Sequence, residues 1–417
     1  MADIMSVIRS FEEPCACGLK HQTAVKDVRI GSGLVHHVGE ILAQNGFPKD
    51  LLLVADNNTL KAADGIMQSL TGFNVSTHIW DDLRVATMVE VDQIAALIHG
   101  KDIGVLSVGS GSINDPCRLA AARENKMLCI FGTAPSMDGF ASYSSPIVKD
   151  GFKASYPAKS PEVIIGDTAI LAAAPVALKS AGFGDMVAKY VGLVDWKISS
   201  ILTGERYCER VAKLTRDAVD ILMDMADRVT ANDEETAGKI FEALLMTGIG
   251  MSFMQNSRPA SGSEHIIAHL VECKELPHGI IPNYHGEDIG VCTLEMLKFY
   301  QSLAQKEHIC AHKEQVDFED VYRFYGDMAD EVKKLNYPKT VTDEVDPALL
   351  EEKWSEVREA ILSVPSYEVC YDAMKRAGCK LTTEEIGKER GFFEQCVKYS
   401  PYMRYRLTLL RMRDMID

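Results

Sequence analysis

The first part of the chain alternates short apolar segments with amphipathic ones, and this alternation is the strongest constraint on its fold. Several segments rich in β-branched residues have the length of buried strands: Val25–Ile30, Leu51–Ala55, Asn74–Ile79, Ile103–Val108 and Met127–Phe131. Helical periodicity fills the intervals, as in Leu34–Gln44, which Ser32 is placed to cap. Strands that alternate with helices usually pair in parallel and are covered on both faces. We therefore expect an α/β, Rossmann-like domain with a parallel sheet over residues 1–165.

The pattern changes near residue 165. Ile147–Tyr156 has the form of a hairpin with Asp150-Gly151 in its turn, and it precedes the change. Beyond it, long segments carry helical periodicity and no strand alternation: Asp185–Leu202, Glu209–Val229, Glu235–Gln255, Ile289–Gln305, Glu351–Leu362 and Glu384–Lys398. The chain of 417 residues is also long for a single core. We therefore expect a second domain, an all-α helical bundle, over residues 166–417.

Composition excludes several classes of partner. A formal net charge of −16 disfavours nucleic acid and would be repelled by an anionic membrane surface. No apolar run approaches the roughly 20 residues of a membrane-spanning helix. The 11 cysteines are scattered, apart from Cys15-Ala-Cys17, and no signal peptide is evident. These features predict reduced thiols in a cytoplasmic enzyme or binding protein that contacts neither nucleic acid nor membranes.

Three histidines in the second half have the spacing of a metal site. His265 and His269 are four residues apart, so on a helix they share one face. His285, next to Gly286, can approach them from a neighbouring segment. Imidazoles that converge in this way commonly hold a divalent metal of the zinc class. A carboxylate ligand is also expected, and Asp185 is the best candidate because it follows two glycines in an apolar run, where we expect it to open a helix. The competing interpretation is two surface imidazoles and an Asp that stabilises a helix start.

A separate set of residues indicates a nucleotide. The segment Gly109–Asp115 runs from a predicted strand into a helix, and its glycines allow a pyrophosphate to approach the exposed amides. It lacks the full Gly-x-Gly-x-x-Gly pattern and does not follow the first strand, so a plain glycine turn stays open. Asp56 ends a strand and is placed to bind an adenosine ribose, or simply to cap a helix. The hydroxyl-rich loop Gly132–Ser142 follows the next strand.

Together these motifs resemble one known family. Gly109–Asp115, Gly132–Gly139, Gly182–Lys189, Ser257–His265 and His285-Gly-Glu occur in the order typical of the glycerol-1-phosphate dehydrogenases. That family belongs to the glycerol dehydrogenase and dehydroquinate synthase-like fold group. The similarity covers about residues 25–300, and the longer tail resembles the bacterial branch. One small departure is Ser110, where a glycine is common.

The resemblance implies a role for each motif. The implied metal ligands are Asp185, His265 and His285, and Asp138, Asp185 and His269 would contact substrate. The implied dinucleotide contacts are Asp56, Gly111, Ser112, Ile113, Asn114, Asp115, Thr133, Ala134, Pro135, Ser136 and Ser142. For the substrate phosphate, Arg258 just before the metal helix is our own candidate, although an Arg in a Pro-flanked loop is equally typical of a structural role.

The implied reaction is the reduction of dihydroxyacetone phosphate to sn-glycerol 1-phosphate, a building block of phospholipids. NAD(H) is the expected cofactor, with NADP(H) possible, and a zinc, nickel or iron ion would polarise the C2 carbonyl for hydride transfer. A homodimer is expected. Three alternatives stay open: a dehydrogenase of unphosphorylated polyols, a dehydroquinate synthase-like cyclase, and a non-catalytic ligand-binding relative.

Overall fold

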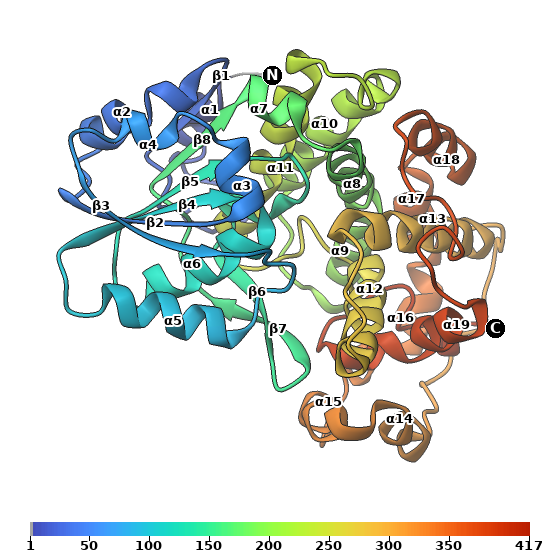
Figure 1. Ribbon diagram of the computed structural model, residues 1–417. Helices are drawn as coiled ribbons and strands as arrows, with labels where there is room; N and C mark the ends of the chain where they lie inside the picture. Colours follow the sequence, from blue (N-terminus) through green and yellow to red (C-terminus); the bar gives the residue numbers. More distant parts are fainter. Residues whose placement is uncertain (1–2) are drawn as a thin grey trace.

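A computed structural model describes residues 3–417 and has the predicted arrangement of a parallel sheet followed by helices (Figure 1). The strands of the six-stranded parallel sheet lie in the order β1-β8-β5-β4-β2-β3. Their bounds are β1 Asp27–Gly31, β2 Asp50–Asp56, β3 Asn74–Trp80, β4 Ile103–Gly109, β5 Leu128–Gly132 and β8 Val163–Asp167. The predicted fold class, a Rossmann-like sheet joined to a helical bundle, is confirmed.

Helices cover both faces of the sheet because its strands are apolar on both sides. Leu51 and Leu53 of β2 pack toward one face, in a core that includes residues of α2 (Val38–Gln44) and α4 (Ile66–Ser69). Leu52 and Val54 point to the other face, in the core with α5 (Met88–Ile98) and α6 (Gly111–Arg123). The short helices α3 (Asn57–Ala62) and α7 (Thr168–Ala173) follow β2 and β8.

The register of the central strands determines where a ligand can approach. In the β4–β5 pair, Val105 is opposite Leu128 and Gly109 is opposite Gly132. Both strands therefore end at the same level, and the two loops that follow them lie side by side. The hairpin of β6 (Ser144–Lys149) and β7 (Phe152–Pro157) leaves the sheet next to this edge, with Asp150 and Gly151 both at positive φ in its turn.

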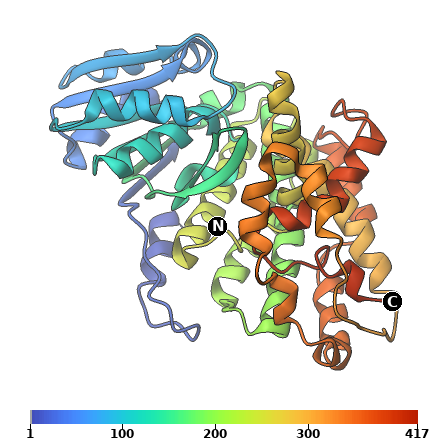
Figure 2. The same cartoon turned by 90° about the horizontal axis from the view of Figure 1, so that it is seen from below.

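The second half of the chain is helical, as predicted, and it lies beside the carboxyl edge of the sheet (Figures 1 and 2). The helices nearest the sheet are α8 (Val176–Val187), α9 (Lys189–Thr203), α10 (Glu209–Met223), α11 (Glu234–Met254), α12 (Ser263–Glu275) and α13 (His285–Leu303). The tail adds α14 (Phe318–Tyr325), α15 (Ala329–Asn336), α16 (Pro347–Glu352), α17 (Trp354–Leu362), α18 (Tyr367–Arg376) and α19 (Arg390–Tyr399). No helix within residues 3–417 combines the length and the apolarity needed to cross a membrane.

Several element boundaries differ from the prediction. The interior strand β8, which lies between β1 and β5, was missed because Val163–Gly166 is a very short apolar run with no alternation. It extends past the predicted domain boundary at residue 165. Residues 384–389 lie outside α19, which begins only at Arg390. The amino-terminal helix α1 (Ile4–Ser10) and the segment after it pack on the helical half, where the Phe11 ring stacks on Phe253 with 4.6 Å between centroids.

The prediction that Asp185 opens a helix was wrong. Asp185 lies in the last turn of α8, and the two glycines before it are inside the helix. They serve close packing: a Cβ on Gly182 would lie 1.8 Å from the carbonyl oxygen of Pro135, and one on Gly184 would lie 2.6 Å from that of Gly286. Glycines that look like helix breakers in the sequence are here the points where α8 touches its neighbours.

Candidate active site

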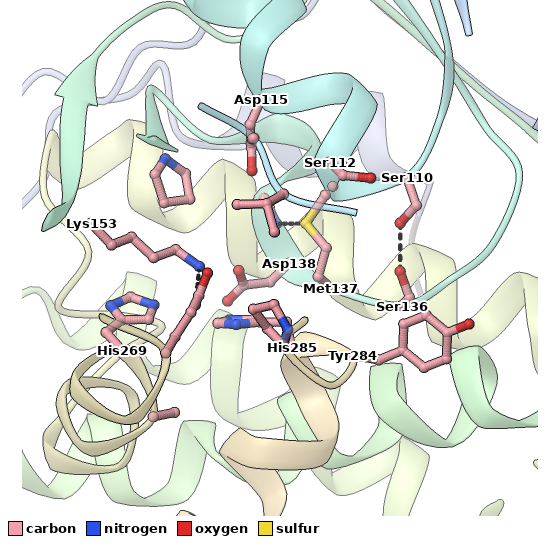
Figure 3. Close-up of a pocket in the computed structure, with 18 of the residues that line it drawn as sticks. Ser110, Ser112, Asp115, Ser136, Met137, Asp138, Lys153, His269, Tyr284 and His285 are labelled. Carbon is pink, nitrogen blue, oxygen red and sulfur yellow. Dashed lines mark hydrogen bonds and ion pairs between the residues drawn. The ribbon is translucent and has the colours of Figure 1, made fainter. Parts of the chain in front are cut away.

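A cavity of about 390 Å³ lies between the carboxyl edge of the sheet and the helices α12 and α13. Its walls are the loops after β2, β4 and β5, the β6–β7 hairpin, the facing sides of the two helices, and a carboxyl-terminal segment near Arg404. Figure 3 shows side chains from these parts of the chain gathered around one space, with His285 near Asp138 and Lys153 near His269. The cavity is therefore built from residues far apart in the sequence.

The structure brings the three predicted metal ligands together. One oxygen of Asp185 and one nitrogen each of His265 and His285 lie within 4.8 Å of one another. His265 Nε2 and Asp185 Oδ1 are 3.5 Å apart. Asp185 reaches the group from the end of α8, His265 from the first turn of α12, and His285 is the first residue of α13. Two imidazoles and a carboxylate suit zinc, nickel or ferrous iron.

A second layer of side chains orients these ligands. Glu264 Oε1 lies 2.7 Å from His265 Nδ1, so the proton on Nδ1 is held there and Nε2 faces Asp185. This carboxylate–histidine arrangement is the usual support of a metal-binding imidazole. Lys189 Nζ lies 2.7 Å from Asp185 Oδ1 and 2.6 Å from Asp138 Oδ2, so a buried ammonium joins the two carboxylates. The donor set and its support together fit a divalent metal.

Burial and charge set the protonation states around this point. Burial lowers the pKa of His285 to about 3, which leaves its imidazole neutral and able to coordinate. Burial opposes ionisation of Asp185, but the Lys189 ammonium and His265 outweigh it and hold the Asp185 pKa well below its usual range. Burial also lowers the pKa of His269, and nearby Lys153 adds to this effect.

The nucleotide side of the cavity contains most of the predicted dinucleotide contacts. Asp56, Gly111, Ser112, Asp115, Thr133, Ala134, Ser136 and Ser142 all line it. Gly111 and Ser112 begin α6 and line the cavity, so a helix start, which favours phosphate binding, lies at its wall. Asp56 also caps α3, since Oδ1 accepts the amide hydrogen of Thr59 at 2.8 Å. The helix-cap interpretation of Asp56 is confirmed, and ribose binding at this cavity-lining position stays a prediction.

Three residues of the predicted contact set do not line the cavity. Ile113 packs against Gly109, where an added Cβ would lie 2.7 Å from Ile113 Cγ1. Asn114 Oδ1 accepts the Ser107 hydroxyl hydrogen at 2.5 Å, and this bond ties α6 to β4. Pro135 packs its carbonyl against Gly182. These residues therefore support the loops after β4 and β5 from the side that faces away from the cavity.

The substrate side contains Asp138 and His269, as the resemblance implied, but Arg258 lies elsewhere. The Arg258 guanidinium is buried against Glu205, with Nη2 2.5 Å from Oε2 and Nε 2.8 Å from Oε1. Its remaining nitrogen donates to the carbonyl of Leu407 at 2.8 Å. The assignment of Arg258 to a substrate phosphate was therefore wrong, because the guanidinium lies outside the cavity and Glu205 neutralises its charge.

Four other cations line the cavity, and no sequence motif marks them: Arg84, Lys153, Arg404 and Arg406. Arg404 and Arg406 come from the tail, Lys153 is the second residue of β7, and Arg84 follows β3. Arg406 donates to the Ser257 hydroxyl at 2.6 Å and to the Ser261 carbonyl at 2.7 Å. Within residues 3–417, neither Arg404 nor Arg406 forms an ion pair, whereas Lys153 Nζ lies 2.6 Å from Glu272. Both arginines therefore keep an unneutralised charge at the cavity wall.

Comparison with known proteins decides the family. Residues 29–175 match the iron-containing alcohol dehydrogenase family. A glycerol-1-phosphate dehydrogenase [NAD(P)+] of Bacillus velezensis is 37% identical over 293 residues, which cover 68% of this chain and 74% of the relative. The one of Halalkalibacterium halodurans is 31% identical and covers 74% of this chain and 79% of the relative. This chain belongs to the glycerol-1-phosphate dehydrogenase family. It is thus an oxidoreductase.

Solved structures agree on the fold. A sulfoacetaldehyde reductase from Bifidobacterium kashiwanohense, in complex with NAD+, has a TM-score of 0.61 at 16% identity and covers 95% of this chain and 96% of that chain. An NADH-dependent butanol dehydrogenase from Thermotoga maritima has a TM-score of 0.62 at 14% identity, with 94% and 92% covered. At such low sequence identity, these two similarities establish only that this chain has the same fold as the two solved structures.

Proposed function

We propose that this family member is a metal-dependent sn-glycerol-1-phosphate dehydrogenase that reduces dihydroxyacetone phosphate with a nicotinamide cofactor. The observation that carries the proposal is that one cavity contains a three-residue set of metal ligands, a glycine turn at a helix start, and two arginines that form no ion pair within residues 3–417. The name shared by its closely matching relatives supports the same activity. We further propose that the chain divides into a nucleotide-binding domain and a helical domain. The protein is proposed to be a homodimer in the cytoplasm.

Asp185, His265 and His285 would hold the metal, and Glu264 and Lys189 would position them. When bound, the metal supplies Lewis-acid polarisation of the substrate carbonyl. Because the three ligands come from α8, α12 and α13, their geometry depends on how closely these helices pack. Asp138 lies on the same side and donates its amide hydrogen to Asp185 Oδ2 at 2.9 Å, so it joins the nucleotide loop to the ligand set.

His269 is our candidate for the proton relay. Its Nε2 is buried without a hydrogen-bond partner among residues 3–417, and it lies on the cavity wall one helical turn from His265. Buried polar atoms are normally satisfied, so a free one at a cavity suggests a ligand contact. The depressed pKa of His269 keeps its imidazole neutral, and a neutral imidazole can hold a substrate hydroxyl and pass a proton to it.

Arg404 and Arg406 are the proposed phosphate ligands, in place of Arg258. A guanidinium binds a phosphate through two parallel charge-assisted hydrogen bonds, which an uncharged hydroxyl cannot match. Burial lowers the pKa of Arg406 to about 10, and the nearby cations Arg258 and Arg404 add to this effect. Such a cavity attracts an anion and disfavours dihydroxyacetone or glycerol.

For the cofactor, we propose a preference for NADH over NADPH. Asp56 lies at the cavity end of β2 and would accept from a ribose 2′-hydroxyl while repelling a 2′-phosphate. The residues that follow Asp56 are neutral until Lys61, so the preference should be moderate.

The deciding experiment measures NADH oxidation on dihydroxyacetone phosphate and on dihydroxyacetone, in protein whose metal content is known. We expect a preference for the phosphorylated substrate of several orders of magnitude, from about 1.5–3 kcal/mol for each charged hydrogen bond. His265→Ala and His285→Ala should remove both metal and activity. Arg406→Ala should raise KM for the phosphorylated substrate only, while Arg413→Ala in the same tail serves as the control.

The two catalytic alternatives predict different outcomes. Equal efficiency on both substrates would indicate a polyol dehydrogenase. Turnover without net oxidation of NADH would indicate a cyclase. A metal-replete, active His285→Ala protein would contradict the ligand set itself.

A further inference from the structure

A second cluster of metal-binding side chains lies away from the cavity. It consists of Cys15, Cys17, His21 and Cys208, which we call the thiol cluster; one ligand atom of each lies within 4.8 Å of all the others. None of the four lines the cavity described above. Three of them come from the segment between α1 and β1, and Cys208 immediately precedes α10. The cluster thus joins the amino-terminal segment to the helical half.

The distances within the thiol cluster are those of a tetrahedral metal site. Metal–sulfur bonds of about 2.3 Å and metal–nitrogen bonds of about 2.0 Å give tetrahedron edges of about 3.8 Å between sulfurs and about 3.5 Å between sulfur and nitrogen. Cys15 Sγ and Cys208 Sγ are 3.6 Å apart. His21 Nε2 is 3.3 Å from Cys17 Sγ and 3.5 Å from Cys208 Sγ. A disulfide would need sulfurs about 2.05 Å apart.

The histidine of the thiol cluster is oriented as a metal ligand. His21 Nδ1 lies 3.2 Å from the carbonyl oxygen of Phe253, which can accept only if Nδ1 carries the proton. That tautomer leaves the lone pair of Nε2 pointing at the thiols, and a backbone carbonyl is a common support for a metal-binding imidazole. The rings of Phe11 and Phe253 enclose His21, which is 2% exposed. The imidazole therefore has little freedom to turn away.

The local chain also favours a metal over free thiols. Gly18 adopts φ +77° and donates its amide hydrogen to the Cys15 carbonyl at 2.9 Å, a tight turn that directs Cys15 and Cys17 to the same side. From Glu12 to Lys26 the chain forms neither helix nor strand. A long segment of this kind has few backbone hydrogen bonds to stabilise it. A metal ion that links its residues to the helical half would stabilise it by closing the loop.

We propose that the thiol cluster binds a structural zinc ion through three cysteines and one histidine. Four protein ligands leave no open position, so the ion would be structural and not catalytic. Thiolates favour zinc over hard cations such as magnesium. On binding, three thiols form metal–sulfur bonds and release their protons to solvent, while His21 binds as the neutral imidazole. The ion fastens the segment before β1 to the start of α10, and this role is independent of the function proposed for the cavity.

The test separates the thiol cluster from the cavity metal. His265→Ala protein lacks a complete ligand set in the cavity, so zinc that stays after dialysis reports the thiol cluster. We expect about one zinc per chain in this background. Replacing it with cobalt should give thiolate-to-cobalt charge-transfer absorption and the intense visible bands of a tetrahedral site. A zinc-free His265→Ala protein, or a cobalt spectrum without thiolate bands, would overturn the proposal.

Cysteine variants identify the ligands. In the His265→Ala background, Cys17→Ser and Cys208→Ser should lose the zinc and unfold at lower temperature, whereas Cys310→Ser, at an exposed free cysteine, should keep both properties. Should a variant fail to fold, titration of the parent protein with a thiol-specific mercurial gives the same information, because zinc release should require about three thiols. Retention of zinc by folded Cys17→Ser, or a Cys15–Cys208 disulfide in the purified protein, would refute the assignment.

Discussion

Substitution of Gly286 tests whether the metal geometry depends on the contact between α8 and α13. Gly286 follows His285 in the first turn of α13, and Asp185 lies in the last turn of α8. A Cβ on Gly286 would lie 1.8 Å from the carbonyl oxygen of Ala181, whereas real Cβ atoms essentially never approach within 3.0 Å. Gly286→Ala therefore has to move the two helices apart locally by about 1.2 Å.

That displacement is large for a metal site. Ligand distances tolerate about 0.2 Å, and a misplacement of about 1 Å at a catalytic centre costs about 10²-fold in rate. The overpacking itself costs about 1–3 kcal/mol of stability, which a chain of this size can tolerate. We therefore expect folded Gly286→Ala protein that has lost most of its metal and at least about 99% of its kcat/KM.

The control lies one turn further along α13. A Cβ on Gly290 would lie 2.8 Å from Cε of Met374, the end of a flexible side chain that can move aside. Gly290→Ala should therefore keep metal and activity. Circular dichroism, metal analysis after dialysis and NADH turnover on both variants provide the comparison. Gly286→Ala protein with the metal content and rate of the parent would refute the reasoning.

Three further predictions follow from single side chains. Lys189→Met leaves two buried carboxylates uncompensated and should destabilise the metal-free protein by about 3–5 kcal/mol, with added zinc restoring part of the lost Tm in scanning calorimetry. Asp56→Ser keeps a helix cap but removes the carboxylate, so the NADH and NADPH values of kcat/KM should converge; an unchanged ratio would place the ribose elsewhere. Burial raises the pKa of Asp288 from 3.8 to about 7. Between these two pH values, the folded state of the metal-free protein keeps a proton on Asp288 that the unfolded state has already released. The folded state should therefore lose up to about 4 kcal/mol of stability as pH rises from 3.8 to about 7. Urea unfolding should show a flatter pH profile for Asp288→Asn, and equal slopes would contradict the assignment.

The sequence predicted the elements whose signal is local. The alternation of strands and helices, the Asp150-Gly151 hairpin and the helix that carries His265 and His269 all depend on short-range periodicity or turn chemistry, and all are present. The strand β8 was missed because its apolar run, Val163–Ile165, is shorter than that of any predicted strand and ends at Gly166 and Asp167. Its interior place in the sheet depends on pairing with β1 and β5, which are distant in sequence.

The site was predicted only where motifs mark it. The resemblance covered the metal and dinucleotide residues, but a motif does not separate contact from support: Ile113 and Asn114 belong to the glycine-turn motif and yet pack behind it. Arg404 and Arg406 lie outside any motif and reach the cavity through tertiary packing alone. Arg258 was misassigned because sequence proximity to His265 says nothing of Glu205, which neutralises it.

The late position of the carboxyl-terminal cavity wall has a consequence for synthesis of the chain. Arg404 is translated about 120 residues after His285, which at ordinary elongation rates is on the order of ten seconds later. Helix α12 packs against α19 and against the turn Ser400–Met403, so one of its sides stays uncovered during this interval. The nascent chain therefore has its complete metal-ligand set before the two arginines reach the cavity. A ribosome-bound chain stopped before Arg404 should be able to load metal while having none of the tail's attraction for anions.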